Sequence, residues 1–375
     1  MKIPGISLLA TYLIRQNLFF MVICLFAGTG IYLLADIFDR LDQFLDAGFT
    51  TWEVLRYFGV KVPMIFSQIL PAVFLLGLVI QLGILTRNQE MLAVRAGGVS
   101  FGWFIRFFLV YSLIWGGIEF AFSQYVGVYG EIEAARIWKE DLRKQKLDRE
   151  VVNNVWFKSG NYIVYCDTAL PYQKRAEGVS VYQFAENSQS LAEIAAAKSA
   201  KALEGEWILE DVNILATEAF MGWKEEKMSF PIEQDLKVFA LSHRPDSQAR
   251  LPLNELGDLI SRLKNTGSNT EFLETAWHGK WAYAFSMVPM GLCALVIVTI
   301  CQNLYINVGI GLLFVFAYYG AFLVGMSAGE SGSMPPAIGA WFGNIVLTTL
   351  ALFRLTYYNS PRLQRLFIKW FDLFK

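Results

Sequence analysis

Six long runs of apolar residues constrain this chain more than any other feature of its sequence. A helix needs about 20 mostly apolar residues to cross the hydrocarbon core of a membrane. The six runs are Leu18–Ala35, Val62–Leu85, Gly102–Phe122, Trp281–Cys301, Leu304–Ala328 and Met334–Leu355. The sequence therefore predicts an α-helical integral membrane protein with six transmembrane helices.

The composition agrees with this class. The chain is 55% hydrophobic and 17% charged, whereas soluble domains carry about 25% charged residues. The formal net charge of −1 does not indicate any particular partner, and no nucleic acid is expected. The first run is not interpreted as a cleaved secretory signal, because the stretch from Arg15 to Asp36 is long for one and no small-residue cleavage site follows it.

A short charged segment, Thr86–Phe101, separates the second and third runs. The apolar residues at 91, 92 and 94 fit a short helix, and Gly97-Gly98 gives a stop signal after it. A helix held between two membrane spans can transmit a movement of a soluble partner to those spans. A plainer interpretation makes the segment a solvated linker that caps two helices, and the spacing alone favours neither.

Lysines and arginines are enriched in short cytoplasmic loops, so their placement predicts the orientation of the chain. They occur in Thr86–Phe101, in the tail after residue 353, and before the first span at Lys2 and Arg15. With six spans, all these positions lie on the same side. Both termini and Thr86–Phe101 are therefore expected in the cytoplasm, and the large insert Gly130–Lys280 on the other side.

The insert changes from a charged helical run, Glu131–Leu147, to a pattern of period two. Alternation of apolar and polar residues with turn residues between the runs is typical of strands. The segments that carry this pattern are VVNNVWF, NYIVYC, VSVYQF, EWILEDVNILATEA and DLKVFAL. We expect an all-β domain, a sandwich or jellyroll-like, with antiparallel sheets. Leu251–Thr266 then returns to a helical pattern and leads back to the membrane.

The sequence carries few residues for catalysis or metal binding. Its four cysteines have no metal-ligand spacing, His243 and His278 are isolated, and neither a metal nor another cofactor is expected. The phosphate-binding pattern GxxxxGK[ST] does not occur, so ATP hydrolysis would need a separate partner. Glu119 lies within an apolar run and leaves open a proton-coupled transporter that works alone.

Several motifs occur in a particular order along nearly the whole chain. They are Leu75-Leu76-Gly77, Gly83-Ile84-Leu85, Glu90, Ala96-Gly97-Gly98, residues 155–161, the helix Leu256–Gly267, Lys280, Pro335-Pro336, Ala340-Trp341 and Asn344. Residues 155–161 resemble a Leu-Trp-x-Lys-x-Gly pattern at the first strand. Together these motifs resemble the LptF/LptG family, the permease subunits of the lipopolysaccharide export transporter, and within it the LptG members most.

This resemblance implies a set of partners and a location. A paired LptF-like permease, a homodimeric cytoplasmic LptB-like ATPase and periplasmic LptC/LptA-like jellyroll proteins are expected, in the bacterial inner membrane. Lipopolysaccharide would enter a cavity between the two permeases. ATP-driven closure of the cavity would push it onto the periplasmic β domains and toward the outer membrane.

The resemblance also assigns roles to residues. Thr86–Phe101 matches the family's coupling helix, and Glu90 falls on the glutamate that faces the ATPase. The coupling residues are then Arg87, Glu90, Met91, Leu92, Arg95, Gly97 and Gly98. Two lysines that some members carry near the outer ends of the first two spans correspond here to Asp36 and Met64.

The substrate cavity is expected to use the basic residues that flank the outer ends of the first two spans, Arg40, Arg56 and Lys61, with Glu119 packed inside the bundle. Lys61 is the candidate for a phosphate contact, and a snorkelling lysine that never touches substrate is the alternative. The spans themselves, mainly the first, second and fifth, would supply apolar wall.

In the β domain, Val155, Phe157, Ile163 and Tyr165 occupy alternate positions and are candidates to line a periplasmic groove. The alternative is that they fill the domain's own core. The predicted domains are 1–129 with a coupling helix near 86–98, a jellyroll-like domain at 130–250, a connecting helix at 251–280, and spans with a basic tail at 281–375. A subunit that transmits force to periplasmic partners without moving lipid is the competing function.

Overall fold

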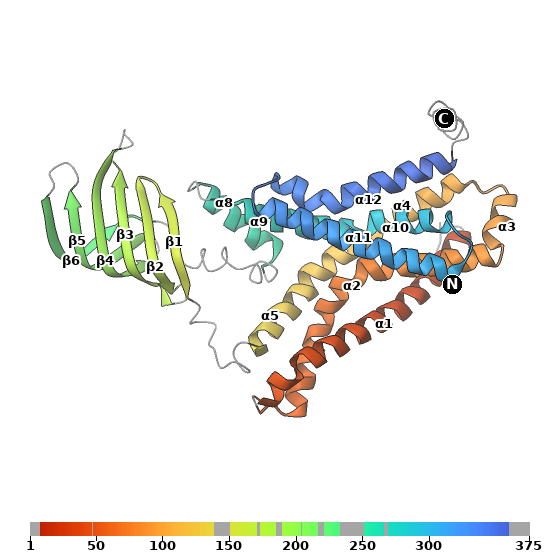
Figure 1. Ribbon diagram of the computed structural model, residues 1–375, viewed down its shortest axis with the longest axis horizontal. Helices are drawn as coiled ribbons and strands as arrows, with labels where there is room; N and C mark the ends of the chain where they lie inside the picture. The colour runs from red at the N-terminus through yellow and green to blue at the C-terminus, as the bar shows by residue number, and fades with distance from the viewer. Residues whose placement is uncertain are drawn as a thin grey trace, which may run out of the picture. The chain divides into compact units, whose positions relative to one another are not determined.

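A computed structural model describes residues 8–46, 48–138, 151–170, 173–184, 190–203, 205–216, 221–232, 251–265 and 269–359. These residues divide into two compact units. One unit comprises Met1–Gly130 with Thr275–Lys375 and is helical, and the other comprises Glu131–Glu274 and contains a β-sheet (Figure 1). The insert expected from the sequence is therefore a compact unit of its own.

Five helices in the described residues are long and apolar enough to cross a membrane. They are α1 (Leu8–Asp46), α2 (Thr51–Arg87), α4 (Phe101–Phe122, continued by the π-helical turn η1, Ser123–Gly127, and by α5, Val128–Arg136), α11 (Leu304–Glu330) and α12 (Pro336–Asn359). They contain five of the six predicted runs. Helix α1 extends well beyond its apolar run, and its acidic end remains helical up to Asp46.

The remaining predicted run, Trp281–Cys301, is not one straight helix. It is divided between α9 (Glu271–Phe285) and α10 (Met287–Val298), which are bent by 41° relative to each other. Pro289 lies in the first turn of α10, where its missing N–H leaves the carbonyl of Phe285 without the donor that a continuous helix would supply. Counted as one span, the bent pair raises the number of spans in the described residues from five to six.

Helix α2 is the centre of the helical unit. Of its most apolar window, 61% is buried, compared with 11% for α1 and 22% for α11. It packs against α1, α4, α10 and α11, and Phe74, Leu78 and Leu82 are fully buried in the core that these helices share. Close packing in this core holds α2 in place, while α1 and α11 keep large apolar faces exposed.

Glycines allow α11 and α12 to approach each other closely. The backbones are so close that a Cβ built on Gly325 would overlap the carbonyl oxygen of Gly339, and a Cβ on Gly339 would lie 2.6 Å from the oxygen of Gly325. Small residues have this role in many membrane helix pairs. Two other glycines of α11, Gly309 and Gly320, have no atom within 4 Å of such a Cβ and do not take part in a close helix contact here.

The β unit contains one six-stranded antiparallel sheet in the described residues. Its strands are β1 (Val152–Ser159), β2 (Tyr162–Leu170), β3 (Arg175–Phe184), β4 (Leu191–Leu203), β5 (Glu206–Ala216) and β6 (Met221–Phe230), and each pairs with its neighbour in sequence. The sheet is curved (Figure 1). These strands therefore form a meander, not the crossed order of a jellyroll. Alternation identifies strands and their faces, but it carries no information about which strands pair.

Three further predictions concern the segments that precede or follow the described sheet. The helix α8 (Leu253–Asn265) is present, and Leu256, Leu259 and Leu263 on its predicted apolar face are buried. The charged helical run after Glu131 is described only up to residue 138, with α5 at its start. The predicted strand DLKVFAL lies outside the described residues.

The glycine contact predicts how two similar substitutions will differ. We expect Gly325→Ala to destabilise the chain by about 1–3 kcal/mol, because the added methyl group overpacks the α11–α12 contact. Gly320→Ala on the same helix should leave stability unchanged or slightly increased. Thermal unfolding of the two purified variants in detergent would measure the difference, and equal midpoints would show that this contact does not hold the helices together.

Candidate functional site

The short helix predicted between the second and third spans is present as α3 (Glu90–Ala96). Helix α2 ends at Arg87, and Gln89 then takes a left-handed conformation with φ of 61°, which reverses the chain into α3. After α3, Gly98 has φ of 91°, a value that glycine adopts without strain. The predicted stop at Gly97-Gly98 is therefore confirmed.

One side of α3 is anchored and the other is exposed. Met91 and Val94 are partly buried against the core of the helical unit, whereas Leu92 is 61% exposed. Arg95 is also exposed, and its guanidinium lies 6.0 Å from the centre of the Phe101 ring at the start of α4. The helix thus presents an apolar and a basic side chain on a fixed support.

Glu90 is half-buried and has partners within the chain. The hydroxyl of Tyr12, on α1, donates to Oε2 of Glu90 at 2.8 Å, and Nδ2 of Asn88 donates to Oε1 at 3.4 Å. The bond from Tyr12 joins α3 to the first span across 78 residues of sequence. Tyr12 could not be singled out from the sequence alone, because tyrosines near the ends of apolar runs are common interfacial residues.

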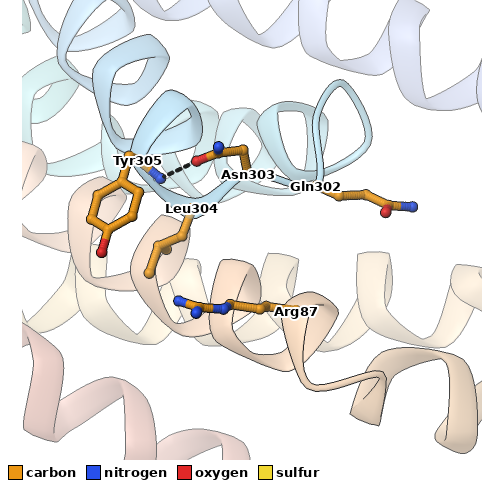
Figure 2. Close-up of a pocket in the computed structure, with 5 residues that line it drawn as sticks. All are labelled: Arg87, Gln302, Asn303, Leu304 and Tyr305. Atoms are coloured by element: carbon orange, nitrogen blue, oxygen red, sulfur yellow. Dashed lines mark hydrogen bonds between the residues drawn. The ribbon is translucent and has the colours of Figure 1, made fainter.

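Two hollows lie beside α3. One, of about 430 Å³, is lined by Arg87 and by residues 302–305 at the turn into α11. Figure 2 shows the side chains of Arg87 and Leu304 converging, with Gln302 pointing away, while Asn303 accepts a hydrogen bond from the backbone N–H of Tyr305 at 2.9 Å. The other, of about 320 Å³, lies between α3 residues such as Met91 and Arg95 and the end of α10. A protein segment could contact α3 and this turn together.

The predicted cavity residues Arg40 and Lys61 meet at one carboxylate. Nζ of Lys61 donates to Asp36 at 2.6 Å, and Nε of Arg40 donates to the other oxygen of Asp36 at 3.0 Å. Lys61 is only 5% exposed. In this structure Lys61 therefore joins α2 to α1, and its charge is neutralised by Asp36.

The other two predicted cavity residues lie apart from this pair. Arg56 is exposed near the start of α2. Glu119 is fully buried in α4, where Oε1 accepts a hydrogen bond from the hydroxyl of Ser67 on α2 at 3.2 Å. Its burial inside the bundle is as expected for an intramembrane carboxylate. The structure therefore does not bring the four residues together in one site.

An apolar hollow of about 190 Å³ lies among α1, α2 and α4. Its lining has no charged or strongly polar side chain and consists of Leu18, Met21, Val22, Leu25, Phe66, Leu70, Val73, Trp115, Ile118 and Phe122. The hollow offers apolar contacts alone, which suit a hydrocarbon chain.

The four predicted groove residues of the β unit do not share one face. Val155 and Phe157 pair across β1–β2 with Cys166 and Val164, and all four are buried. Ile163 and Tyr165 pair with Lys158 and Trp156 on the opposite, more exposed face. The residues were chosen by alternation within each strand, and alternation does not determine how the faces of two strands correspond across a turn.

The two faces of the sheet also differ in chemistry. On the exposed face, the Trp156 ring lies 4.5 Å from the ring of Tyr165 and stacks with that of Tyr182 at 6.1 Å. On the buried face, desolvation raises the pKa of the Cys166 thiol to about 12, so it stays protonated and unreactive. No group of three or more histidine, cysteine or acidic residues that could hold a metal occurs in the described part of the chain.

The Asp36 site predicts different costs for its two cations. Lys61→Gln should destabilise the chain by about 3 kcal/mol, because it leaves a nearly buried carboxylate with one of its two cations. Arg40→Gln removes a more exposed partner and should cost about 1 kcal/mol or less. Unfolding midpoints of the purified variants would rank them, and a larger loss for Arg40→Gln would contradict this account.

Comparison with known proteins agrees with this arrangement. The chain is 25% identical over 276 residues to the lipopolysaccharide export system permease protein LptG of Haemophilus influenzae, covering 70% of this chain and 73% of that protein. The family described as lipopolysaccharide export system permease LptF/LptG matches residues 11–357. That match takes in the span helices, α3 and the inserted β unit, and so the chain belongs to the LptF/LptG family of lipopolysaccharide export permeases.

Proposed function

We propose that this chain is a permease subunit of an ABC transporter that extracts lipopolysaccharide from the inner membrane and passes it toward the outer membrane. The observation that carries the proposal is α3, a short helix with one side packed on the span core and the other exposed. Its partners would be an LptF-like permease, a cytoplasmic homodimeric LptB-like ATPase and periplasmic LptC/LptA-like jellyroll proteins.

In this proposal, α3 receives the push from the ATPase. Glu90 is half-buried, so a basic residue of the ATPase could reach its carboxylate from solvent. Arg87 and Arg95 would orient the contact, since Arg87 lines the hollow at the turn into α11 and Arg95 lies over the ring of Phe101. Gly97 and Gly98 end the helix and fix where α4 begins.

The orientation follows from the same distribution of basic residues that the sequence presents. Arg87 and Arg95 beside α3, with the basic tail, favour a cytoplasmic position for α3 and both termini. The β unit, separated from α3 by one span on the N-terminal side, would then be periplasmic. This places the ATPase contact and the lipid-accepting domain on opposite sides of the membrane.

Lipid would be held mainly by apolar surface. Helices α1 and α11 are the least buried of the spans, and large side chains such as Phe26 and Phe316 are 70% and 72% exposed. A paired permease could close a cavity against these two helices. The apolar hollow among α1, α2 and α4 would add a place for an acyl chain.

Positive charge for the lipid phosphates would come largely from the paired permease. Arg40 and Lys61 are both bonded to Asp36, so Lys61 could contact a phosphate only if that contact opened or if the phosphate replaced the carboxylate. Arg56 remains an exposed candidate at the start of α2. Glu119 lies inside the bundle and would not face a phosphate.

The β unit would receive the lipid on the face that carries Val155 and Phe157. This face is lined by apolar side chains across β1, β2 and β5, including Val164 and Trp207. The described sheet ends at β1 and β6, and β6 is exposed along most of its length. Such an edge can pair with a strand of a similar domain.

The coupling role predicts the behaviour of Glu90→Ala. The substitution should weaken the complex with the ATPase, or uncouple ATP hydrolysis from lipid release. Truncation of one partner of a buried interfacial ion pair costs roughly 2–5 kcal/mol. Co-purification and ATPase assays of the reconstituted complex would measure it, and wild-type assembly together with wild-type lipid release would show that Glu90 has no coupling role.

Tyr12→Phe is the control that separates this role from an internal one. It removes the hydrogen bond to Glu90 and leaves the carboxylate in place. If Glu90 acts on the ATPase, Tyr12→Phe should have a smaller effect on assembly than Glu90→Ala. Equal losses would assign Glu90 to the α1–α3 contact instead.

The face of the sheet that receives lipid can be tested with photo-crosslinking residues. We expect probes at Val155 and Phe157 to form adducts with lipopolysaccharide during ATP-driven export, because both side chains point to the buried, apolar face. Probes at Ile163 and Tyr165 serve as matched controls on the opposite face of the next strand. Adducts at the control positions alone would reverse the assignment, and adducts at none would favour a closed core.

A further inference from the structure

A turn of α2 inside the bundle lacks one of its backbone hydrogen bonds. Pro71 has no N–H, so the carbonyl of Ser67 has no intrahelical amide donor at position 71. The next carbonyl, that of Gln68, accepts hydrogen bonds from the hydroxyls of Tyr283 and Tyr319, the second at 2.9 Å. Two other span elements, α9 and α11, are therefore bonded to the turn that the proline opens.

Glu119 lies beside the same turn. It is fully buried, and its one hydrogen bond in the described residues comes from the hydroxyl of Ser67 at 3.2 Å. Its second oxygen, Oε2, has no partner there. A buried polar atom of a native protein usually has a partner, so an unpaired carboxylate oxygen points to a group that the protein binds.

No basic side chain of the described residues neutralises Glu119. The ion pairs of the helical unit that involve α1 and α2 join Asp36 to Arg40 and to Lys61. The titratable groups close enough for the charge of Glu119 to act on them are the hydroxyls of Tyr283 and Tyr319, which lie 3.3 Å from each other. The other charged residues of the four elements, with the histidine of α9, are Arg106 on α4, Glu53, Arg56, Lys61 and Arg87 on α2, Glu271, Glu274, His278 and Lys280 on α9, and Glu330 on α11.

The chain path around Glu119 is irregular on two sides. The π-helical turn η1 follows α4 and packs against α2, where a Cβ on Gly127 would lie 3.4 Å from the hydroxyl of Ser67. The bent span breaks at Ser286, three residues after Tyr283, and the hydroxyl of Ser286 is buried without a partner in the described residues. Broken membrane helices with freed backbone oxygens next to a carboxylate are used to bind small cations.

From this geometry we propose, independently of the export role, that Glu119 and the opened turn of α2 form a binding site for one small cation inside the bundle. Its oxygen ligands would come from Glu119 and Ser67, with the phenol oxygens of Tyr283 and Tyr319 around them. The cation is a proton or a monovalent metal ion of the size of sodium. Either would supply the single positive charge that the carboxylate lacks.

The test uses the full-length chain in nanodiscs, with sodium chloride or choline chloride at equal ionic strength and at several pH values. A ligand that binds only the folded state raises its stability. Sodium should raise the unfolding midpoint by roughly 2 °C or more over choline if the site binds the metal. If it binds a proton, the midpoint should fall as pH rises, with no difference between the salts.

Glu119→Gln should abolish either response, because the amide is neutral and needs no counter-charge. Glu330→Gln, which alters a half-buried carboxyl of the same unit, should keep it. Ser67→Ala retains the carboxylate and should weaken the apparent cation affinity several-fold. This variant provides an independent test if Glu119→Gln does not fold. A response that persists in Glu119→Gln, or a wild-type chain that responds to neither salt nor pH, would overturn the proposal.

Discussion

The burial of α2 is the constraint on which the helical unit depends. Among the five straight spans in the described residues it has the largest buried share, and α1, α3, α4, α10 and α11 all contact it. In a membrane, lipid tails are as apolar as leucine, so the apolar side chains of α2 gain little from burial as such. Close packing and specific polar bonds must therefore hold the other helices to α2.

Those polar bonds fall at a few levels of α2, and each level joins it to a different neighbour. Near its start, Lys61 bonds Asp36 of α1. In the middle, Ser67 and the carbonyl of Gln68 bond α4, α9 and α11. Nearer its end, Nε2 of Gln81 donates to the carbonyl of Leu13 on α1 at 2.7 Å. In an apolar medium an unmade bond of this kind is costly, so these contacts fix the register of the helices.

The sequence predicted the elements of this structure better than their contacts. Apolar runs located five spans and the residues of a bent sixth, and the glycine pair located the end of α3. Alternation identified the strands β1, β2, β3 and β5. These features depend on local periodicity, which a single sequence displays. Two strands, β4 (Leu191–Leu203) and β6 (Met221–Phe230), were not among the predicted strands. Strand β4 is rich in alanine, which is uncommon in strands, and most side chains of β6 are exposed on both faces.

The candidate site was harder to predict, because its contacts join residues far apart in the sequence. Asp36 and Lys61 were both noticed as charges near span ends, but their 2.6 Å contact depends on how α1 turns into α2. Tyr12 and Glu90 are 78 residues apart. The opposite faces of Phe157 and Tyr165 follow from strand register, which the turn between β1 and β2 determines. Ser67 and Gln68 are adjacent polar residues inside an apolar run. Such a pair is a sequence signal for the buried polar contacts that α2 makes at this level.

The placement of these bonds on α1 suggests how a push on α3 would travel. At one end, hydrogen bonds of Tyr12, Leu13 and Asn17 hold α1 to its neighbours. Oδ1 of Asn17 accepts a hydrogen bond from the hydroxyl of Tyr111 on α4 at 2.9 Å. At its other end Asp36 ties it to Lys61. Between these ends, most of its apolar surface is exposed. In the proposed export role, a helix bonded at both ends and loosely packed between them would transmit a displacement of α3 along its length. Its exposed middle would stay available to lipid or to a paired permease.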